Sequence, residues 1–241
     1  GFLSFGHWTP SSQSQARSAA DVLRQSIELA VEAERLGWDG AYYRVHHFAR
    51  QLASPFPLLA AVGARTQRIE IGTAVIDMRY ENPLYMAEDA GAADIIAGGR
   101  LQLGISRGSP EQVIDGWKHF GYAPREGENA GDMARRHAEV FLELLNGEGF
   151  AQPNPRPMFP NPPGLLRLEP YSAGLRERIW WGSATNATAA IPPASPRASR
   201  SRAGVPGGYW SISTRPSPAS CCELMRQRVS GGALHASVRI G

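Results

Sequence analysis

Residues 69–106 contain one complete strand–helix–strand unit. Ile-Glu-Ile-Gly-Thr-Ala-Val-Ile, residues 69–76, has the continuous β-branched character of a strand buried on both faces. Asn82-Pro83 is a typical helix start, and the helical pattern that follows ends at Gly98-Gly99. A second strand is expected over residues 101–106. Because two strands joined by a helix can run in the same direction, this unit predicts a parallel pair of strands.

The same alternation runs outward in both directions. A first helix is expected to be capped by Ser18 and to end at Gly37, and its inward face is expected to carry residues at helical spacing. Those residues are Leu23, Ile27, Ala30, Val31 and Leu36. Further helices are predicted over 55–65, 110–120 and 130–145 and from Thr185, and further strands over 2–5, 41–45 and 178–182.

This order of elements predicts an α/β fold. No glycine-rich dinucleotide-binding fingerprint follows the first strand, which favours a (β/α)8 barrel of the TIM type over a Rossmann sheet. A complete barrel takes roughly 250 residues. Only about five strands are predicted by residue 182, so the barrel is expected to be truncated after about five βα units.

Composition excludes several classes of protein. The 241 residues are 42% hydrophobic, which is globular, and no run approaches the roughly 18 uncharged residues of a membrane-spanning helix. The two cysteines, Cys221 and Cys222, are adjacent, which argues against a disulfide framework and a four-cysteine zinc site. With no cationic, cleavable leader at its start, the chain is predicted to be cytoplasmic.

The chain changes character near residue 190. Residues 191–241 hold seven Arg, one Glu and no Lys or Asp, a net charge of +6, so residues 1–190 carry −3. A mildly acidic folded part predicts no nucleic-acid surface. We therefore expect a barrel portion over 1–190 and an Arg/Ser/Pro/Gly-rich tail over 191–241. Our hypothesis is that the tail is a frameshifted extension; the alternative is a low-complexity basic linker.

Two adjacent histidines follow the second predicted strand. In a βα barrel, reactive groups lie at the carboxyl ends of the strands, and His46 and His47 occupy such a position. Neighbouring residues on extended backbone point to opposite sides, which argues against a shared metal ion. A histidine in a pocket there can transfer protons, and a hydrogen-bonded structural role is the alternative for either residue.

An anion site is predicted at two other strand ends. Arg107 follows the fourth strand directly, and its planar guanidinium suits phosphate oxygens. Thr185 and Thr188 lie at the start of a predicted helix, whose free N–H groups also favour an anion. Arg107 and the start of this helix could together bind a single phosphate group. In the alternative interpretation Thr185 only caps its helix and Arg107 forms a surface ion pair.

Taken together, these segments resemble the bacterial-luciferase-like family of flavin-dependent monooxygenases over residues 1 to about 190. Residues 45–48, Val-His-His-Phe, are similar to a Glu-His-His-Phe segment of that family. Residues 71–75 are similar to its third strand, residues 82–89 to the helix that follows, and residues 99–108 to its fourth strand. The four landmarks occur in the order that the family has.

The resemblance implies a role for several residues. His46 would lie beside the flavin ring and exchange or orient a proton, and Ser106 would lie near the reactive edge of the ring. Ala74 and Val75 would form a cis peptide bond beneath the ring. The phosphate of the flavin would be held by the remaining members of the implied site, which are Arg107, Ser109, Thr185 and Thr188. His47 and Glu88 would face a dimer partner.

The implied activity is oxidation of a small hydrophobic substrate by O2 with reduced FMN as cofactor. A separate flavin reductase or NAD(P)H would supply the electrons, and a homodimer is expected. Apolar side chains at the mouth of the site, such as Phe5, Trp8 and Phe48, would exclude water. Three alternatives stay open: a flavin-binding protein without turnover, an inactive truncated fragment, and an oxidoreductase that uses the deazaflavin F420.

Overall fold

The computed structural model describes residues 1–9, 16–108, 111–156 and 162–182. Within these residues five strands form one sheet in the order β1-β2-β3-β4-β5, and every neighbouring pair is parallel. The strands are β1 (Phe2–Ser4), β2 (Gly40–Tyr43), β3 (Glu70–Asp77), β4 (Leu101–Ser106) and β5 (Ile179–Gly182). The predicted α/β fold with parallel βα units is therefore confirmed.

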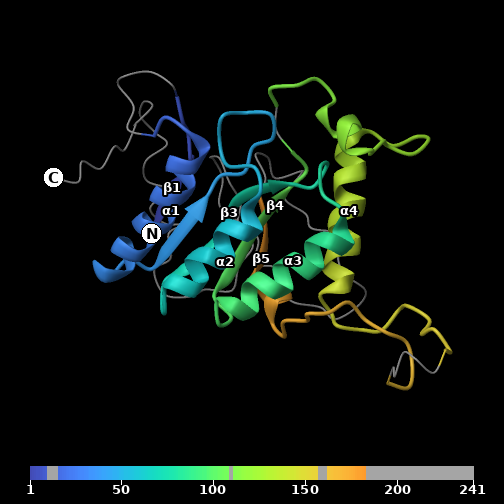
Figure 1. The fold of residues 1–241 in the computed structure, drawn as a ribbon. Coiled ribbons are helices and arrows are strands. Elements are labelled where there is room, and N and C mark those ends of the chain that lie inside the picture. Colours follow the sequence, from blue (N-terminus) through green and yellow to red (C-terminus); the bar gives the residue numbers. More distant parts are fainter. Residues whose placement is uncertain (10–15, 109–110, 157–161, 183–241) are drawn as a thin grey trace, which may run out of the picture.

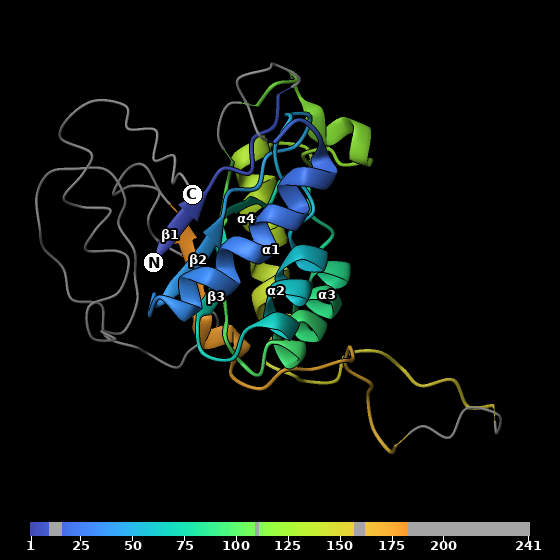
Figure 2. The same cartoon turned by 60° about the vertical axis from the view of Figure 1, so that its left-hand side comes forward.

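Four α-helices lie side by side and cover one face of this sheet (Figures 1 and 2). Each packs against the next one along the chain. They are α1 (Ala19–Arg35), α2 (Pro55–Arg65), α3 (Pro83–Ile96) and α4 (Ala130–Leu144), and two short 3-10 helices, η1 (Gly116–Phe120) and η2 (Leu175–Arg178), complete the elements. None of the helices in the described part of the chain is both long and apolar enough to cross a membrane.

The layer between sheet and helices is closely packed. Ile71 of β3, Leu103 of β4 and Leu59 of α2 are fully buried. At Gly91 of α3 a side chain would begin 2.0 Å from the carbonyl oxygen of Pro170, so only glycine lets that segment lie against the helix. This packing fixes the strands in register and brings the carboxyl ends of β2, β3 and β4 to one edge.

Helix α1 begins where the sequence predicts, but it turns a different face inward. The Ser18 hydroxyl accepts a hydrogen bond from the Asp21 backbone N–H, and the Asp21 carboxylate accepts one from the N–H of Ser18, which makes a capping box. Of the residues predicted to face the core, only Ala30 is fully buried, and Leu23 and Leu36 are exposed. The buried residues of α1 are Val22, Ser26, Ala30 and Ala33, so only Ala30 is common to the two sets. Most of these buried side chains are small, which lets α1 lie close to the sheet. The face of α1 that packs against the sheet is therefore not its most hydrophobic face.

Two other expectations need correction. The helix predicted over 110–120 is only the 3-10 helix η1, which begins at Gly116 after Asp115 in the left-handed conformation. Strand β2 ends at Tyr43 and not at residue 45. The reason is that the chain leaves the ladder early: the N–H of His46 donates to the carbonyl of Leu52 across the following loop, at 2.8 Å. The helix predicted from Thr185 lies outside the described residues.

Candidate functional site

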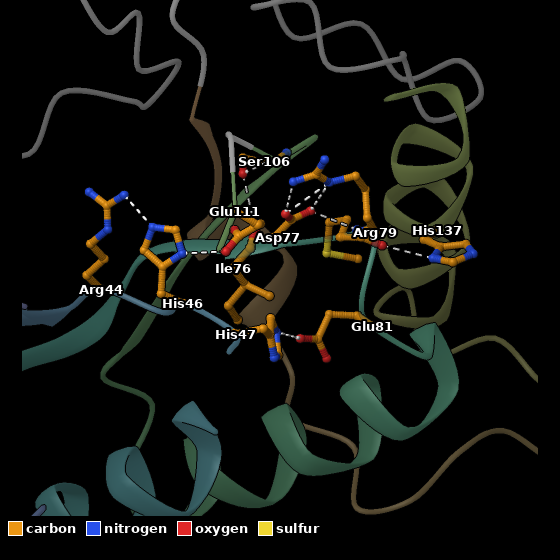
Figure 3. A network of polar contacts seen from close by, with 12 residues as sticks. Arg44, His46, His47, Ile76, Asp77, Arg79, Glu81, Ser106, Glu111 and His137 are labelled. Atoms are coloured by element: carbon orange, nitrogen blue, oxygen red, sulfur yellow. Dashed lines mark hydrogen bonds and ion pairs between the residues drawn. The ribbon is translucent and has the colours of Figure 1, made fainter. Parts of the chain in front are cut away.

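Polar side chains from three strand ends converge at one edge of the sheet (Figure 3). The loop after β2 carries the two histidines, and β3 ends in Asp77, which Arg79 and Glu81 follow. Ser106 closes β4, and Glu111 lies in the loop beyond it. Because β2, β3 and β4 are parallel neighbours, side chains that are distant in the sequence meet at this edge.

His46 is held between two charged side chains. Its Nδ1 lies 2.6 Å from a carboxylate oxygen of Glu111, and its Nε2 lies 2.7 Å from Nη2 of Arg44. The side chains of His46 and Glu111 are only 11% and 4% exposed. Burial raises the pKa of Glu111, although the hydrogen bond from His46 opposes this effect. His46 and Glu111 therefore form a histidine–carboxylate pair that is almost completely shielded from water, at the carboxyl end of β2.

His47 points to the other side of its loop, as predicted for adjacent residues on extended chain (Figure 3). Its ring stacks on Tyr80 with the centroids 4.3 Å apart, and its Nε2 lies 3.9 Å from a carboxylate oxygen of Glu81. That nitrogen is buried and has no hydrogen-bond partner among the residues that the structure describes. Burial lowers the pKa of His47.

Glu81 is a second carboxyl group with a shifted pKa. Burial, together with the nearby negative charges of Asp77 and Asp89, raises its pKa to about 7. Asp77, by contrast, is paired: its carboxylate accepts hydrogen bonds at 3.0 Å from both the backbone N–H and Nε of Arg79. The carboxylate of Asp77 is therefore neutralised by Arg79, whereas the carboxyl group of Glu81 can take up a proton near neutral pH.

Ser106 joins the ends of β3 and β4. Its hydroxyl donates to the carbonyl of Ile76 at 3.4 Å and accepts from the N–H of Gly108 at 3.2 Å. Gly108 has φ +96°, and a side chain there would begin 2.2 Å from Nε of Arg79. The positive φ favours glycine where the loop passes the Asp77–Arg79 pair.

Arg107 is exposed and lies close to the start of α4. Its Cδ is 3.7 Å from the position where a side chain on Gly131 would begin. Its guanidinium has no hydrogen bond or ion pair to any of the residues described in the structure. The alternative interpretation, a surface ion pair, is therefore not seen within the described part of the chain.

The Ala74–Val75 peptide bond is cis, which confirms the geometry that the resemblance implies. The β3–β4 ladder shifts its register between Thr73 and Ile76, at the same place. Ala74 and Val75 are half-buried, whereas Thr73 and Ile76 on either side are fully buried. The site edge therefore includes a patch made by the apolar side chains of Ala74 and Val75.

Aromatic rings line one side of the site. Phe48, with φ +58°, lies 6.0 Å from Phe120, and both rings are close to Tyr80. Phe48, Phe120 and Phe5 are each about half exposed. Phe5 lies beside the guanidinium of Arg44, whose central carbon is 5.5 Å from the Phe5 ring centroid, and Trp8 is partly buried and packs against the core.

Sequence reasoning identified some members of this site and missed others. The structure brings His46, Ser106, Ala74 and Val75 to the same sheet edge, with Arg107 on the adjoining loop, whereas Ser109, Thr185 and Thr188 lie outside the described residues. The charged partners that the sequence analysis missed are Arg44, Asp77, Arg79, Glu81 and Glu111. Their position just before or after the predicted strand ends is the feature of the sequence from which they could have been identified. No group of three or more His, Cys, Asp or Glu suited to a metal ion occurs in the described part of the chain.

A family model described as "Luciferase-like monooxygenase" matches residues 3–191. This match covers most of the chain. The chain belongs to the luciferase-like monooxygenase family. It spans less than half the length of the curated relatives that it matches.

Several of the curated relatives are named monooxygenases. The 4-hydroxyprotoasukamycin monooxygenase of Streptomyces nodosus subsp. asukaensis is 33% identical over 52% of this chain and 33% of its own length. Limonene 1,2-monooxygenase of Rhodococcus erythropolis is 29% identical over 63% of this chain and 38% of its own length. The enzymatic class of the family is therefore oxidoreductase.

Solved structures of other proteins share this fold. A monooxygenase from Streptomyces bottropensis superposes with TM-score 0.61 at 23% identity, covering 78% of this chain and 54% of that one. The oxygenating constituent of 3,6-diketocamphane monooxygenase from Pseudomonas putida, a complex with FMN, superposes with TM-score 0.53 at 22% identity, covering 64% and 41%. The coenzyme F420-dependent tetrahydromethanopterin reductase of Methanopyrus kandleri gives TM-score 0.50 at 16% identity, covering 69% and 48%.

Proposed function

We propose that the chain derives from a flavin-dependent monooxygenase that uses reduced FMN and O2 to oxidise a small hydrophobic substrate. The observation that carries the proposal is the position of two groups at one sheet edge: the buried His46–Glu111 pair, and Arg107, four residues before Glu111. A proton-exchanging group and an anion-binding group on neighbouring loops suit a phosphorylated, redox-active ring system.

The residues present fit an FMN molecule. The exposed guanidinium of Arg107 is a donor for phosphate oxygens, and Ser109, Thr185 and Thr188 are proposed to complete the phosphate site. The apolar patch at Ala74 and Val75 is proposed to support the flat ring. When bound, reduced FMN would supply the two electrons with which one oxygen atom of O2 enters the substrate and the other leaves as water.

The protein's own part in this reaction is proton transfer and exclusion of water. His46 is proposed to exchange a proton at the sheet edge, and Ser106 to lie near the reactive edge of the ring. The rings of Phe48, Tyr80 and Phe120 provide an apolar wall that favours a hydrophobic substrate and keeps water away. Limonene 1,2-monooxygenase among the relatives supports this substrate class.

We propose two kinds of partner. The Pseudomonas putida structure is called an oxygenating constituent, which supports a separate reductase as the source of reduced FMN here. Helix α3 exposes four apolar side chains, which supports a homodimer; they are Leu84, Tyr85, Ile95 and Ile96. We place the protein in the cytoplasm, where such a reductase and NAD(P)H are available.

The proposal is tested by titrating the full chain with FMN and following the quenching of flavin fluorescence. Arg107→Ala is expected to weaken binding by about 1.5–3 kcal/mol, or roughly 10- to 150-fold, the range for a charged hydrogen bond. Arg24→Ala, on the exposed face of α1, is the matched control and is expected to bind like wild type. Equal affinity of Arg107→Ala and wild type would remove Arg107 from the site.

A second cofactor is tested in the same way, because a structure of the same fold is F420-dependent. Titration with F420 is expected to give weaker binding than FMN. Tighter binding of F420 would replace the monooxygenase proposal by an F420-dependent oxidoreductase. Oxygen consumption with reduced FMN and a terpene then separates an active enzyme from a flavin-binding protein without turnover, and the absence of any flavin binding identifies an inactive fragment.

A further inference from the structure

The contacts of His46 determine which of its nitrogens carries the proton. A guanidinium has five N–H donors and no acceptor, so the 2.7 Å contact between Arg44 and Nε2 requires Nε2 to accept. A neutral imidazole has one donor and one acceptor nitrogen, and hence Nδ1 carries the hydrogen and donates to Glu111 at 2.6 Å. A protonated imidazolium would direct an N–H of Nε2 at the guanidinium, which this contact excludes.

We propose that Glu111 and Arg44 are positioning residues that hold His46 as the neutral Nδ1–H tautomer, with Arg44 capping Nε2. Glu111 fixes the ring from one side, and its side chain is nearly inaccessible to water. Arg44 fixes it from the other side and covers the lone pair.

The side chain of Arg44 lies between His46 and an aromatic ring. Its side chain is half-buried, and its guanidinium carbon lies 5.5 Å from the centroid of the exposed Phe5 ring. Within the described ranges its side chain contacts this ring and His46, and no carboxylate pairs with it. With the guanidinium in this position, Arg44 covers the lone pair of Nε2 while Nδ1 faces Glu111.

The tautomer can be measured without any cofactor. Long-range 1H–15N correlation spectra of the 15N-labelled full chain give separate shifts for protonated and unprotonated imidazole nitrogens, and a His46→Gln variant assigns the His46 signals among the six histidines. In wild type at neutral pH we expect Nδ1 in the protonated range and Nε2 in the unprotonated range. A protonated Nε2, or averaged shifts for both nitrogens, would overturn the proposal.

Variants then test the cause. Each of Arg44→Ala and Glu111→Ala leaves one constraint in place, whereas the double variant removes both and is expected to show averaged shifts from two exchanging tautomers. Glu81→Gln, which alters the carboxyl group beside His47, is the matched control and is expected to leave the His46 signals unchanged. A double variant with wild-type shifts, or a control with averaged ones, would contradict the assignment.

A functional role for Glu111 rests on the proposed function, and its test is separate. Glu111→Gln is expected to lower kcat roughly 10- to 100-fold, the cost of a misplaced catalytic group, with FMN affinity close to wild type. Failure of wild type to bind FMN would end the proposed function and leave the tautomer assignment intact. Unchanged kcat in Glu111→Gln, in an enzyme that does bind FMN, would overturn the positioning role.

Discussion

At the scale of single residues, the site depends on charged groups that are removed from water and compensated to different degrees. Asp77 is paired with Arg79, and the carboxylate of Glu111 accepts a hydrogen bond from Nδ1 of His46. Glu81 has no such hydrogen bond among the residues that the structure describes, because its neighbour Nε2 of His47 is 3.9 Å away, beyond hydrogen-bond distance. We therefore expect different effects of substitution: replacing His46 should lower turnover, and replacing Glu81 should change the pH dependence of stability.

His46→Ala is expected to lower turnover by about 10²- to 10⁴-fold, the usual contribution of a positioned acid or base, because it removes the proposed proton-exchanging group. FMN affinity is expected to change far less, since the phosphate contacts remain. The measurement is steady-state oxygen consumption beside an FMN titration. His7→Ala, an exposed histidine near the N-terminus, is the control. If His46→Ala turns over like the control, His46 has a structural role only.

Glu81 makes folding dependent on pH. Its pKa is raised from 4.5 to about 7 in the folded chain, so between these values the folded protein keeps a proton that the unfolded chain has released. The contribution of Glu81 to stability therefore falls as pH rises from about 4.5 to 7, and stays low above it. Glu81→Gln is expected to remove this loss, which raises the free energy of unfolding at pH 8 relative to pH 5 by on the order of 1–3 kcal/mol.

Urea denaturation at both pH values measures this difference. Glu139→Gln, on the exposed side of α4, is the matched control and is expected to keep the wild-type pH dependence. The same decline of stability with pH in Glu81→Gln and in wild type would show that Glu81 ionises normally in the folded chain.

At the scale of elements, the starts of the helices and the ends of the strands determine where the site residues lie. The capping box at Ser18 fixes the start of α1, whose buried small residues let it pack on α2 and the sheet. Asn129 and Asp132 form a second capping box at the start of α4, beside Arg107. These local signals are visible in the sequence because a cap satisfies N–H groups of its own helix and depends little on the rest of the molecule.

Ser18→Ala is expected to destabilise the protein by about 1 kcal/mol, because it leaves the first N–H groups of α1 without the Ser18 hydroxyl. Thermal or urea denaturation measures the change. Ser54→Ala is the matched control: Ser54 precedes α2 in the same cap position but makes no side-chain hydrogen bond to it. Equal destabilisation by the two substitutions would mean that the Ser18 bond contributes nothing.

At the scale of the whole molecule, five parallel strands form an open sheet within the described residues, with β1 and β5 each paired on one side. Parallel strands are stable when both neighbours and both faces are covered. The family match ends at residue 191, next to the change in composition near residue 190. We therefore propose that residues 1–190 are the barrel portion, and that residues 191–241 were produced by a frameshift.

The nucleotide sequence across codon 190 tests this proposal. Another reading frame is expected to encode further alternating strand and helix patterns that continue the barrel. The absence of such patterns in both other frames would contradict the frameshift and favour a basic linker or tail.

The sequence by itself determined the order of the βα units, the starts of α1, α3 and α4, and the position of His46 and Ser106 at the carboxyl ends of β2 and β4, although β2 ends two residues earlier than predicted. Periodicity and caps report the local chain, so they are readable without a structure. Only the tertiary structure decided that Glu111 meets His46, 65 residues away, and that Glu81 faces His47. Such contacts depend on the register of neighbouring strands and on the path of the loops beyond them. The burial that shifts the pKa of Glu81 is likewise a property of the assembled edge, to which several elements contribute at once.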